Sequence, residues 1–259
     1  MCPNCRAFIS TSDRTCPYCG VKLAPPARAR IDTGQVLGGL IPQARFTTII
    51  ILLINTGLYL ADALNPQAGI QNAGISAPWP IEQHQLWRLV TAGFLHGGIL
   101  HILMNSWVLF DLGAEVEQIY GTSRMILFYF VSTVCGFFVS SRIGMHLSLG
   151  SSAGIFGLIG AMLAFGVTDK SALGAAVKSL YTRWLIYALV LSFIPGVDIY
   201  AHIGGVVGGF VIAYLASTPR ARLMWKEPLI RGAAIGCLVL TAAAFAMMFS
   251  VLMSHSAVQ

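Results

Sequence analysis

Long apolar runs are the feature that most limits how this chain can fold. A helix needs about twenty apolar residues to cross the ~30 Å hydrocarbon layer of a membrane, and several such runs occur here. Only 10% of the 259 residues are charged and the mean hydropathy is +0.74, whereas soluble domains carry about 25% charged residues. We therefore expect an all-α polytopic membrane protein, with spans at 46–64, 98–116, 124–143, 150–167, 183–195, 201–217 and 232–254.

The positive charges predict the orientation of these spans, because Lys and Arg accumulate on the cytoplasmic side of a membrane. With a cytoplasmic N-terminus, fourteen of the sixteen Lys and Arg residues fall inside, and only Arg88 and Arg142 fall outside. An odd number of spans then places the C-terminus outside. This orientation explains the net charge of +6. Nucleic-acid binding is not expected, since no basic surface interleaved with aromatic residues is evident.

Four of the six cysteines form the Cys-x-x-Cys pairs "CPNC" and "CPYC" near the start of the chain. Each pair places two thiolates on one metal ion, and two matched pairs complete a tetrahedral zinc site. Residues 1–24 are therefore expected to be a zinc-ribbon-like domain that needs its metal to fold. Its zinc ligands are Cys2, Cys5, Cys16 and Cys19. A redox pair is the disfavoured alternative.

The segment that follows this domain connects it to the membrane spans but does not define its role. Residues 25–44 are rich in Pro and Arg and are expected to be a linker to the membrane. Two interpretations of the domain stay open, namely a docking module for a protein partner and a simple folded cap. The chain begins with a cysteine cluster instead of a basic and then apolar segment, so no signal peptide is expected.

Polar side chains inside the predicted spans indicate function, because such groups are costly in a membrane. His101 and Asn105 in "HGGILHILMN" are four residues apart and share one helix face. Ser152 lies in "GSSAGIFG", and His202 lies in "DIYAHIGGVVGG". In the predicted orientation, all four side chains lie toward the outer ends of their spans.

Small residues follow one face of each of the two spans that carry Ser152 and His202. They are Ala153, Gly157, Ala161 and Ala164 in the first span and Gly205, Gly209 and Ala213 in the second. Such faces let two helices approach closely, which would bring Ser152 and His202 within hydrogen-bond reach. The alternative is that these small residues, the serine included, serve packing alone.

Together these groups supply what nucleophilic catalysis needs, namely a hydroxyl, a base and donors to an oxyanion. Ser152 is the candidate nucleophile and His202 the candidate general base. The candidate oxyanion donors are His101, Asn105 and the backbone N–H of Ser152. Asp198 lies one turn before His202 and is expected to be a solvated loop carboxylate, so a dyad without the acidic member of a triad is predicted.

The residues around Ser152 also match the Gly-x-Ser-x-Gly motif of soluble hydrolases, from Gly150 to Gly154. That motif needs a preceding strand and an α/β sheet, and no such sheet is expected here. Gly150 is interpreted as permitting a tight turn into the helix, and Ser151 as a small spacer.

In combination, residues from about 45 to 255 resemble the rhomboid family of intramembrane serine proteases. The resemblance rests on "WR" (Trp87–Arg88), His96, His101, Asn105, the segment from Glu117 to Gly121, "GSSAGIFG" and "AHIGGVVGGF". It implies a six-helix core over 45–219 around a water-filled cavity, followed in 220–259 by a cytoplasmic loop and a seventh span. The N-terminal cysteine pairs and the seventh span resemble extended bacterial forms, which implies a bacterial inner membrane.

The resemblance also implies an activity, in which a Ser–His dyad cleaves transmembrane protein substrates near the outer face of the lipid bilayer, without a cofactor for catalysis. Carried over, Ser152 is the nucleophile and His202 the general base and acid. Phe156 stands where the family usually has an aromatic ring that packs on the catalytic His. The resemblance makes a further set structural, namely Trp87, Arg88, His96, Glu117, Gly150, Gly205 and Gly209.

One residue departs from the family pattern. Ala153 stands where the family usually has Gly, and its methyl group is expected to crowd the oxyanion pocket or the close approach of the helices. The alternative function is a catalytically silent relative that binds transmembrane helices, although silent relatives typically lose the Ser or the His that this chain keeps. A transporter or channel is disfavoured, since no chain of acidic residues lies near the middle of the spans.

Overall fold

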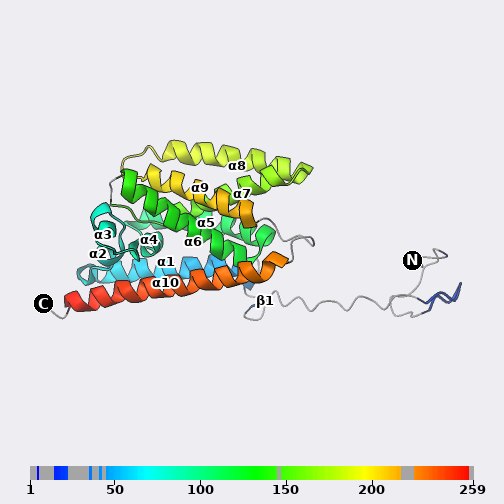
Figure 1. Ribbon diagram of the computed structural model, residues 1–259, viewed down its shortest axis with the longest axis horizontal. Coiled ribbons are helices and arrows are strands. Elements are labelled where there is room, and N and C mark those ends of the chain that lie inside the picture. The colour runs from blue at the N-terminus through cyan, green and yellow to red at the C-terminus, as the bar shows by residue number, and fades with distance from the viewer. Residues whose placement is uncertain are drawn as a thin grey trace. The chain divides into compact units, whose positions relative to one another are not determined.

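The computed structural model describes residues 5, 15–22, 35–36, 41–42, 45–144, 147–216 and 225–256. The chain divides into two compact units, Met1–Gln43 and Ala44–Gln259. In the first unit, β1 (Gln35–Val36) pairs antiparallel with β2 (Ile41–Pro42), and a bridge joins Thr15 to Lys22. All described helices belong to the second unit (Figure 1).

Seven long helices build the second unit within the described residues. They are α1 (Phe46–Leu64), α5 (Ile99–Tyr120), α6 (Thr122–Val139), α7 (Ser152–Thr168), α8 (Ala172–Leu191), α9 (Ile199–Ala216) and α10 (Glu227–Ser256). By length and composition, α1, α5, α6 with its π-helical extension η5 (Ser140–Gly144), α9 and α10 are able to cross a membrane. The helix α7 is apolar but shorter. The prediction of a helical, multi-pass membrane protein is therefore confirmed.

The predicted span 183–195 is wrong, because α8 begins eleven residues earlier and ends before residue 192. The helix starts at Ser171, whose side chain accepts a hydrogen bond from the Gly174 N–H at 3.3 Å, as an N-cap residue does. Lys178 and Arg183 interrupt its apolar character. Hydropathy locates apolar residues and not helical ones, so it placed the start of this helix too late.

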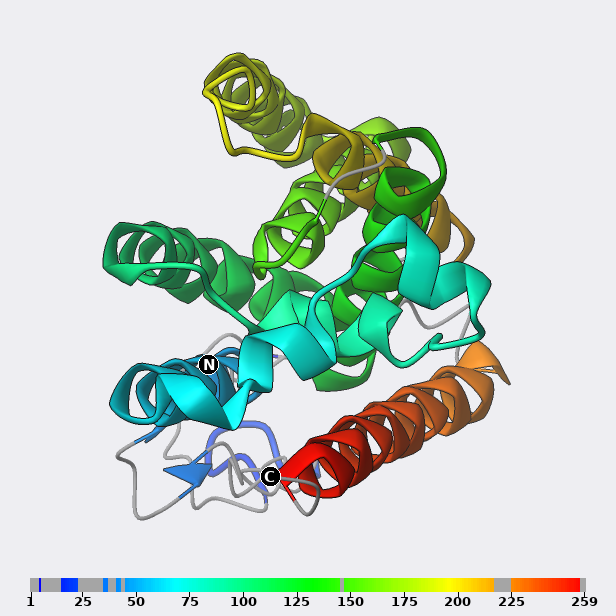
Figure 2. The same ribbon diagram turned by 90° about the vertical axis from the view of Figure 1, so that its left-hand side faces the viewer.

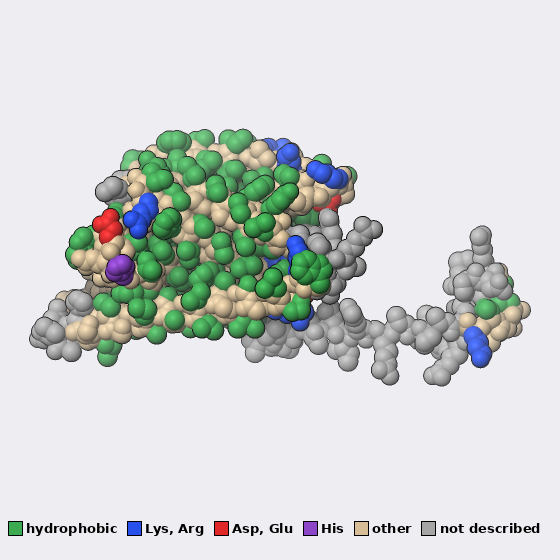
Figure 3. Space-filling model, viewed as in Figure 1, with side chains coloured by type: hydrophobic (Ala, Val, Ile, Leu, Met, Phe, Trp, Pro, Cys, Tyr) green, Lys and Arg blue, Asp and Glu red, His purple; other side chains and the backbone are tan. Residues whose placement is uncertain are grey.

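The most deeply buried helix is α7, nearly all of whose residues are shielded from solvent. It lies among α5, α6, α8 and α9 (Figure 2). Hydrophobic side chains spread over the lateral face of the helical unit and charged ones gather toward its ends (Figure 3). Large hydrophobic side chains such as Trp107, Leu103 and Val207 are exposed, which suits contact with lipid chains.

Short helices fill the segment between α1 and α5. They are η3 (Pro66–Ala68), α2 (Ile70–Gly74), α3 (Pro78–Glu82), α4 (Arg88–Thr91) and η4 (Ala92–Phe94). The buried Arg88 side chain holds this segment together, since its Nη1 donates to the carbonyls of Asn72 (2.7 Å) and Ile75 (2.9 Å). Burial lowers the pKa of Arg88 from its ordinary value. The segment is thus a fixed platform beside the helices.

A buried carboxylate joins three helices at the end of α5. Glu117 accepts hydrogen bonds from the Thr47 N–H (3.1 Å), the Thr47 hydroxyl (2.7 Å) and the Thr122 hydroxyl (2.9 Å). These contacts link the start of α1 and the start of α6 to α5. A buried charge needs such partners, and here they fix the relative positions of the helices.

Candidate active site

The segment before α7 is tied to the short helices on the other side of the site. Ser148 pairs with Ser76 through two backbone hydrogen bonds of 2.9 and 3.0 Å, and the Gly150 N–H donates to the Ala92 carbonyl at 2.9 Å. Gly150 has a φ of +127°, a conformation that favours glycine. The helix then begins at Ser152, whose side chain is half-buried.

His101 and Asn105 lie directly beside this turn. A Cβ placed on Gly150 would be 2.6 Å from His101 Nε2 and 3.5 Å from Asn105 Nδ2. The Asn105 side chain is buried, and its Nδ2 has no hydrogen-bond partner among the residues that the structure describes. An unpaired buried donor is costly. Two nitrogen-bearing side chains of α5 therefore face the backbone that leads into Ser152.

His202 occupies the first turn of α9 and is buried. Its ring stacks on Phe156, with centroids 3.9 Å apart and planes inclined by 11°. Its Nδ1 lies 2.6 Å from the hydroxyl oxygen of Ser192. Among the described residues, the Ser152 hydroxyl makes no hydrogen bond to His202. The structure thus places both side chains at the same ends of neighbouring helices.

Close contact between α7 and α9 follows from their small residues. A Cβ on Gly205 would overlap the Ala153 carbonyl, and a Cβ on Gly209 would overlap the Gly157 carbonyl. Both positions therefore require glycine at this separation. The small-residue pattern predicts this approach, which sets Ser152 and His202 on adjacent helices.

The Ala153 methyl group, expected to crowd the oxyanion pocket or the helix approach, packs against α6. This side chain is fully buried in an apolar cluster with Ile81, Phe137 and Ala201. Its methyl group faces α6, where a Cβ on Gly136 would lie only 2.8 Å away. A glycine on the neighbouring helix thus makes room for the methyl group.

Ser151 is more than a spacer, which corrects the sequence interpretation. Its hydroxyl lies 3.3 Å from His96 Nε2, and both side chains are buried. His96 lies in the loop before α5, and its ring contacts His101 with centroids 5.1 Å apart. Burial, together with the neighbouring His101, lowers the pKa of His96 to about 4, so this ring is neutral at pH 7. A chain of contacts therefore runs from Ser151 to one of the candidate oxyanion donors.

Asp198 is not a solvated loop carboxylate, as expected from the sequence. Its Oδ1 accepts from the N–H groups of Tyr200 and Ala201, both at 3.0 Å, and its Oδ2 accepts from the Ser140 hydroxyl. Asp198 therefore caps α9 and ties it to the end of α6. An Asp directly before a helix is a preferred N-cap residue and was the signal for this cap, whereas nothing in the sequence pointed to Ser192.

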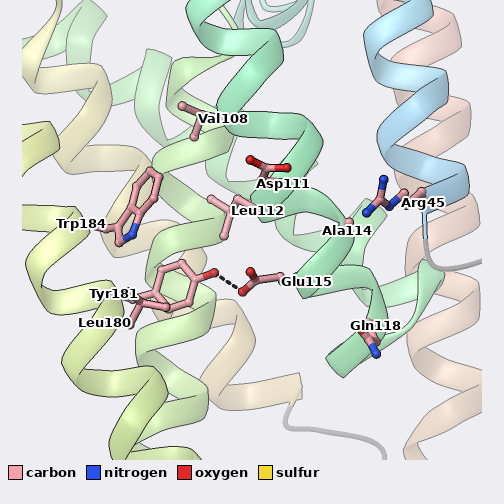
Figure 4. Close-up of a pocket in the computed structure, with 10 residues that line it drawn as sticks. All are labelled: Arg45, Val108, Asp111, Leu112, Ala114, Glu115, Gln118, Leu180, Tyr181 and Trp184. Carbon is pink, nitrogen blue, oxygen red and sulfur yellow. Dashed lines mark hydrogen bonds between the residues drawn. The ribbon is translucent and has the colours of Figure 1, made fainter.

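A separate cavity of about 450 Å³ lies between Arg45, the residue before α1, the second half of α5 and α8 (Figure 4). Its polar lining includes Arg45, Asp111, Glu115 and Tyr181, and the Tyr181 hydroxyl donates to Glu115 at 2.5 Å. None of the candidate catalytic side chains lines this cavity.

The N-terminal unit gathers three cysteines. The sulfur atoms of Cys5, Cys16 and Cys19 all lie within 4.8 Å of one another, and those of Cys5 and Cys16 are 3.7 Å apart. Zinc–sulfur bonds of about 2.3 Å in a tetrahedron separate the sulfurs by about 3.8 Å, so this donor set fits zinc. The fourth predicted ligand, Cys2, lies outside the described residues.

Comparison with protein families agrees with both units. Residues 83–219, more than half of the chain, match the Rhomboid domain. Residues 1–23 match a zinc-ribbon domain.

Curated relatives carry the same family name. RHOMBOID-like protein 1 of Arabidopsis thaliana is 36% identical over 138 residues, which are 52% of this chain and 36% of that protein. Rhomboid protease GluP of Bacillus subtilis is 32% identical over 148 residues, 57% of this chain and 29% of that protein. Inactive RHOMBOID-like protein 8 of Arabidopsis thaliana is 31% identical over 137 residues, 52% of this chain and 39% of that protein. The chain thus spans less than half the length of these relatives. It belongs to the rhomboid family of membrane proteins and carries a zinc-ribbon domain at its N-terminal end.

Proposed function

We propose that this chain is a serine endopeptidase that cleaves transmembrane protein substrates near the outer face of a lipid bilayer. The observation that carries the proposal is the buried Asn105 Nδ2, which has no hydrogen-bond partner in the described part of the chain and lies with His101 Nε2 beside the Gly150 backbone. A donor kept unpaired at this place suits an oxyanion that forms only during reaction. The relative named as a rhomboid protease supports the same activity.

In the proposed reaction, the Ser152 oxygen attacks the carbonyl carbon of a peptide bond while its proton passes to His202 Nε2. The negative charge moves to the carbonyl oxygen, which His101, Asn105 and the Ser152 backbone N–H stabilise. Collapse of this intermediate breaks the C–N bond, and His202 gives its proton to the leaving amine. A water molecule then attacks the ester carbonyl carbon and passes a proton to His202. Cleavage of the ester C–O bond releases the new carboxylic acid, and His202 returns the proton to the Ser152 oxygen.

The substrate must present an accessible carbonyl, because a regular helix hides its carbonyls in hydrogen bonds. Single-span proteins whose helix unwinds locally are therefore the proposed substrate class. The positive charges support a cytoplasmic N-terminus and an outer C-terminus. The proposed location is a bacterial plasma membrane, because the N-terminal cysteine pairs and the seventh span resemble extended bacterial forms. We assign residues 1–24 to the zinc ribbon, 25–44 to a linker, 45–219 to the six-helix catalytic core and 220–259 to a loop and the seventh helix. Zinc held by Cys2, Cys5, Cys16 and Cys19 has a structural role in this proposal.

Cleavage of a transmembrane peptide reporter by the purified full-length protein in detergent tests the assignment. Ser152→Ala and His202→Ala should each abolish cleavage, whereas Ser250→Ala, which changes an exposed serine on α10, should not. A fluorophosphonate should label Ser152. Equal cleavage by the wild type and Ser152→Ala would refute the proposal. A wild type that binds the reporter without cleaving it would instead support the silent alternative.

A further inference from the structure

A buried serine outside the candidate nucleophile segment contacts the candidate base. Ser192 follows the last residue of α8 and is 3% exposed. Its hydroxyl oxygen lies 2.7 Å from the Ala188 carbonyl oxygen and 2.6 Å from His202 Nδ1. Both are short, well-formed hydrogen-bond distances. Ser192 therefore joins the end of α8 to the first turn of α9.

The single proton of the Ser192 hydroxyl determines the direction of the hydrogen bond between Ser192 and His202. A hydroxyl carries one proton, and a carbonyl oxygen only accepts hydrogen bonds. The Ser192 proton is directed to Ala188, so toward the imidazole the Ser192 oxygen acts as the acceptor. His202 Nδ1 is then the donor. A neutral imidazole with its proton on Nδ1 has a lone pair on Nε2.

A second contact restrains the same ring from its face. Phe156 stacks on His202 at 3.9 Å between centroids. Stacking does not stop the imidazole from rotating in its own plane, so a contact at the edge of the ring is needed to restrain that rotation. The Ser192 hydroxyl supplies that contact at Nδ1. The Asp198 carboxylate is already used, because it caps α9 and accepts from Ser140.

We propose that Ser192 is a positioning residue that holds the proton of His202 on Nδ1, so that Nε2 stays free to accept the proton of Ser152. In serine proteases with a triad, an aspartate has this orienting role. Here a neutral hydroxyl from another helix takes the place of the aspartate. The inference rests on the proposed peptidase function.

Matched substitutions at one position separate orientation from packing. Ser192→Thr keeps the hydroxyl, whereas Ser192→Val has nearly the same shape as threonine without it. We expect Ser192→Val and Ser192→Ala to lower kcat by roughly 10-fold or more with KM unchanged, and Ser192→Thr to retain most of the wild-type kcat.

Thr241→Val is the control, because it removes another hydrogen bond from a hydroxyl to a carbonyl, that of Cys237 on α10, and should leave kcat unchanged. Wild-type kcat in Ser192→Val and Ser192→Ala would overturn the proposal, as would a folded Ser192→Thr no more active than Ser192→Val.

The protonation of the ring is measured directly by nitrogen NMR of ¹⁵N-histidine-labelled protein in detergent, with His202→Gln identifying the signal. At a pH where His202 is neutral, the wild type should show the proton on Nδ1, and Ser192→Ala should show a mixture of both tautomers. A wild-type ring with its proton on Nε2 would overturn the inference. This measurement needs no activity, so it separates failure of the inference from failure of the proposed function, which an inactive wild type would reveal.

Discussion

Gly150 shows how much one hydrogen atom in place of a side chain matters at this site. Its φ of +127° disfavours every other residue type, and a Cβ there would lie 2.6 Å from His101 Nε2. The backbone and the candidate oxyanion donors share a space that a methyl group would fill. The geometry of the turn and the access to the donors therefore depend on the same residue.

We predict that Gly150→Ala lowers reporter cleavage about 100-fold or more, the loss typical of a missing oxyanion donor, because the new methyl group displaces His101. Gly69→Ala is a matched control, since Gly69 also has a positive φ, +71°, but a Cβ there would meet no atom of the described residues within 4 Å. That variant should lose only about 1 kcal/mol of stability and keep its activity. Equal activities of the two variants would contradict the role given to Gly150.

Ser151 and Ala153, the neighbours of the candidate nucleophile, contact different parts of the structure. Ser151 turns toward His96 and the loop before α5, and Ala153 turns toward Gly136 on α6. One-residue steps on a helix rotate the side chain by about 100°, so each of the three residues faces a different element. The segment is therefore fixed on several sides while Ser152 stays half-buried.

Among the helices, the contact between α7 and α9 does most to assemble the site. Backbone carbonyls of α7 lie where side chains of α9 would otherwise be, at Gly205 and Gly209. Without a hydrophobic driving force between helices in lipid, such close backbone packing is what holds two helices together. A larger side chain at Gly205 or Gly209 would push α9 away from α7 and so move His202 away from Ser152.

We predict that Gly209→Ala lowers the free energy of unfolding by about 1–3 kcal/mol, because the methyl group would overlap the Gly157 carbonyl. Gly236→Ala on α10 is the control, since within the described part of the chain a Cβ there would meet no atom within 4 Å. It should stabilise the helix by up to about 1 kcal/mol. Unfolding of both variants in detergent, followed by circular dichroism, measures the difference. Gly209→Ala at least as stable as the wild type would argue against tight packing at this contact.

The two units of the chain differ in what stabilises them. The helical unit has an extensive buried core, whereas the N-terminal unit brings three thiols together in a short segment. Domains this small usually need a metal to fold. The two units should therefore respond differently to metal removal.

We predict that the full-length protein binds about one zinc ion per chain and that Cys16→Ser releases it, because Cys16 is buried among the other sulfur atoms. The unfolding temperature of the helical unit should stay unchanged. Cys237→Ala on α10 is the control and should keep the zinc. Metal analysis of the purified variants decides the matter, and full zinc content in Cys16→Ser would exclude a thiolate site of this kind.

Sequence patterns that repeat along one helix predicted much of the architecture. Apolar runs indicated the helices and their approximate bounds, and the small residues of α7 and α9 predicted the contact at Gly205 and Gly209. Such properties are periodic and local, so they can be read from residue types and spacing. Hydropathy failed at α8 because Lys178 and Arg183 interrupt the apolar residues of a helix that begins at Ala172.

Contacts between side chains of different helices could not be obtained in the same way. The bond from Ser192 to His202, the contact of Ser151 with His96, and the direction of the Ala153 methyl group all depend on how far each helix is rotated about its axis. A rotation of one helix by a fraction of a turn replaces one partner with another, and no spacing within a single segment records it. The sequence therefore determines which residue types are present for the chemistry. Which side chains contact and orient them is decided only by the packing of the helices, because it depends on how each helix is rotated about its axis.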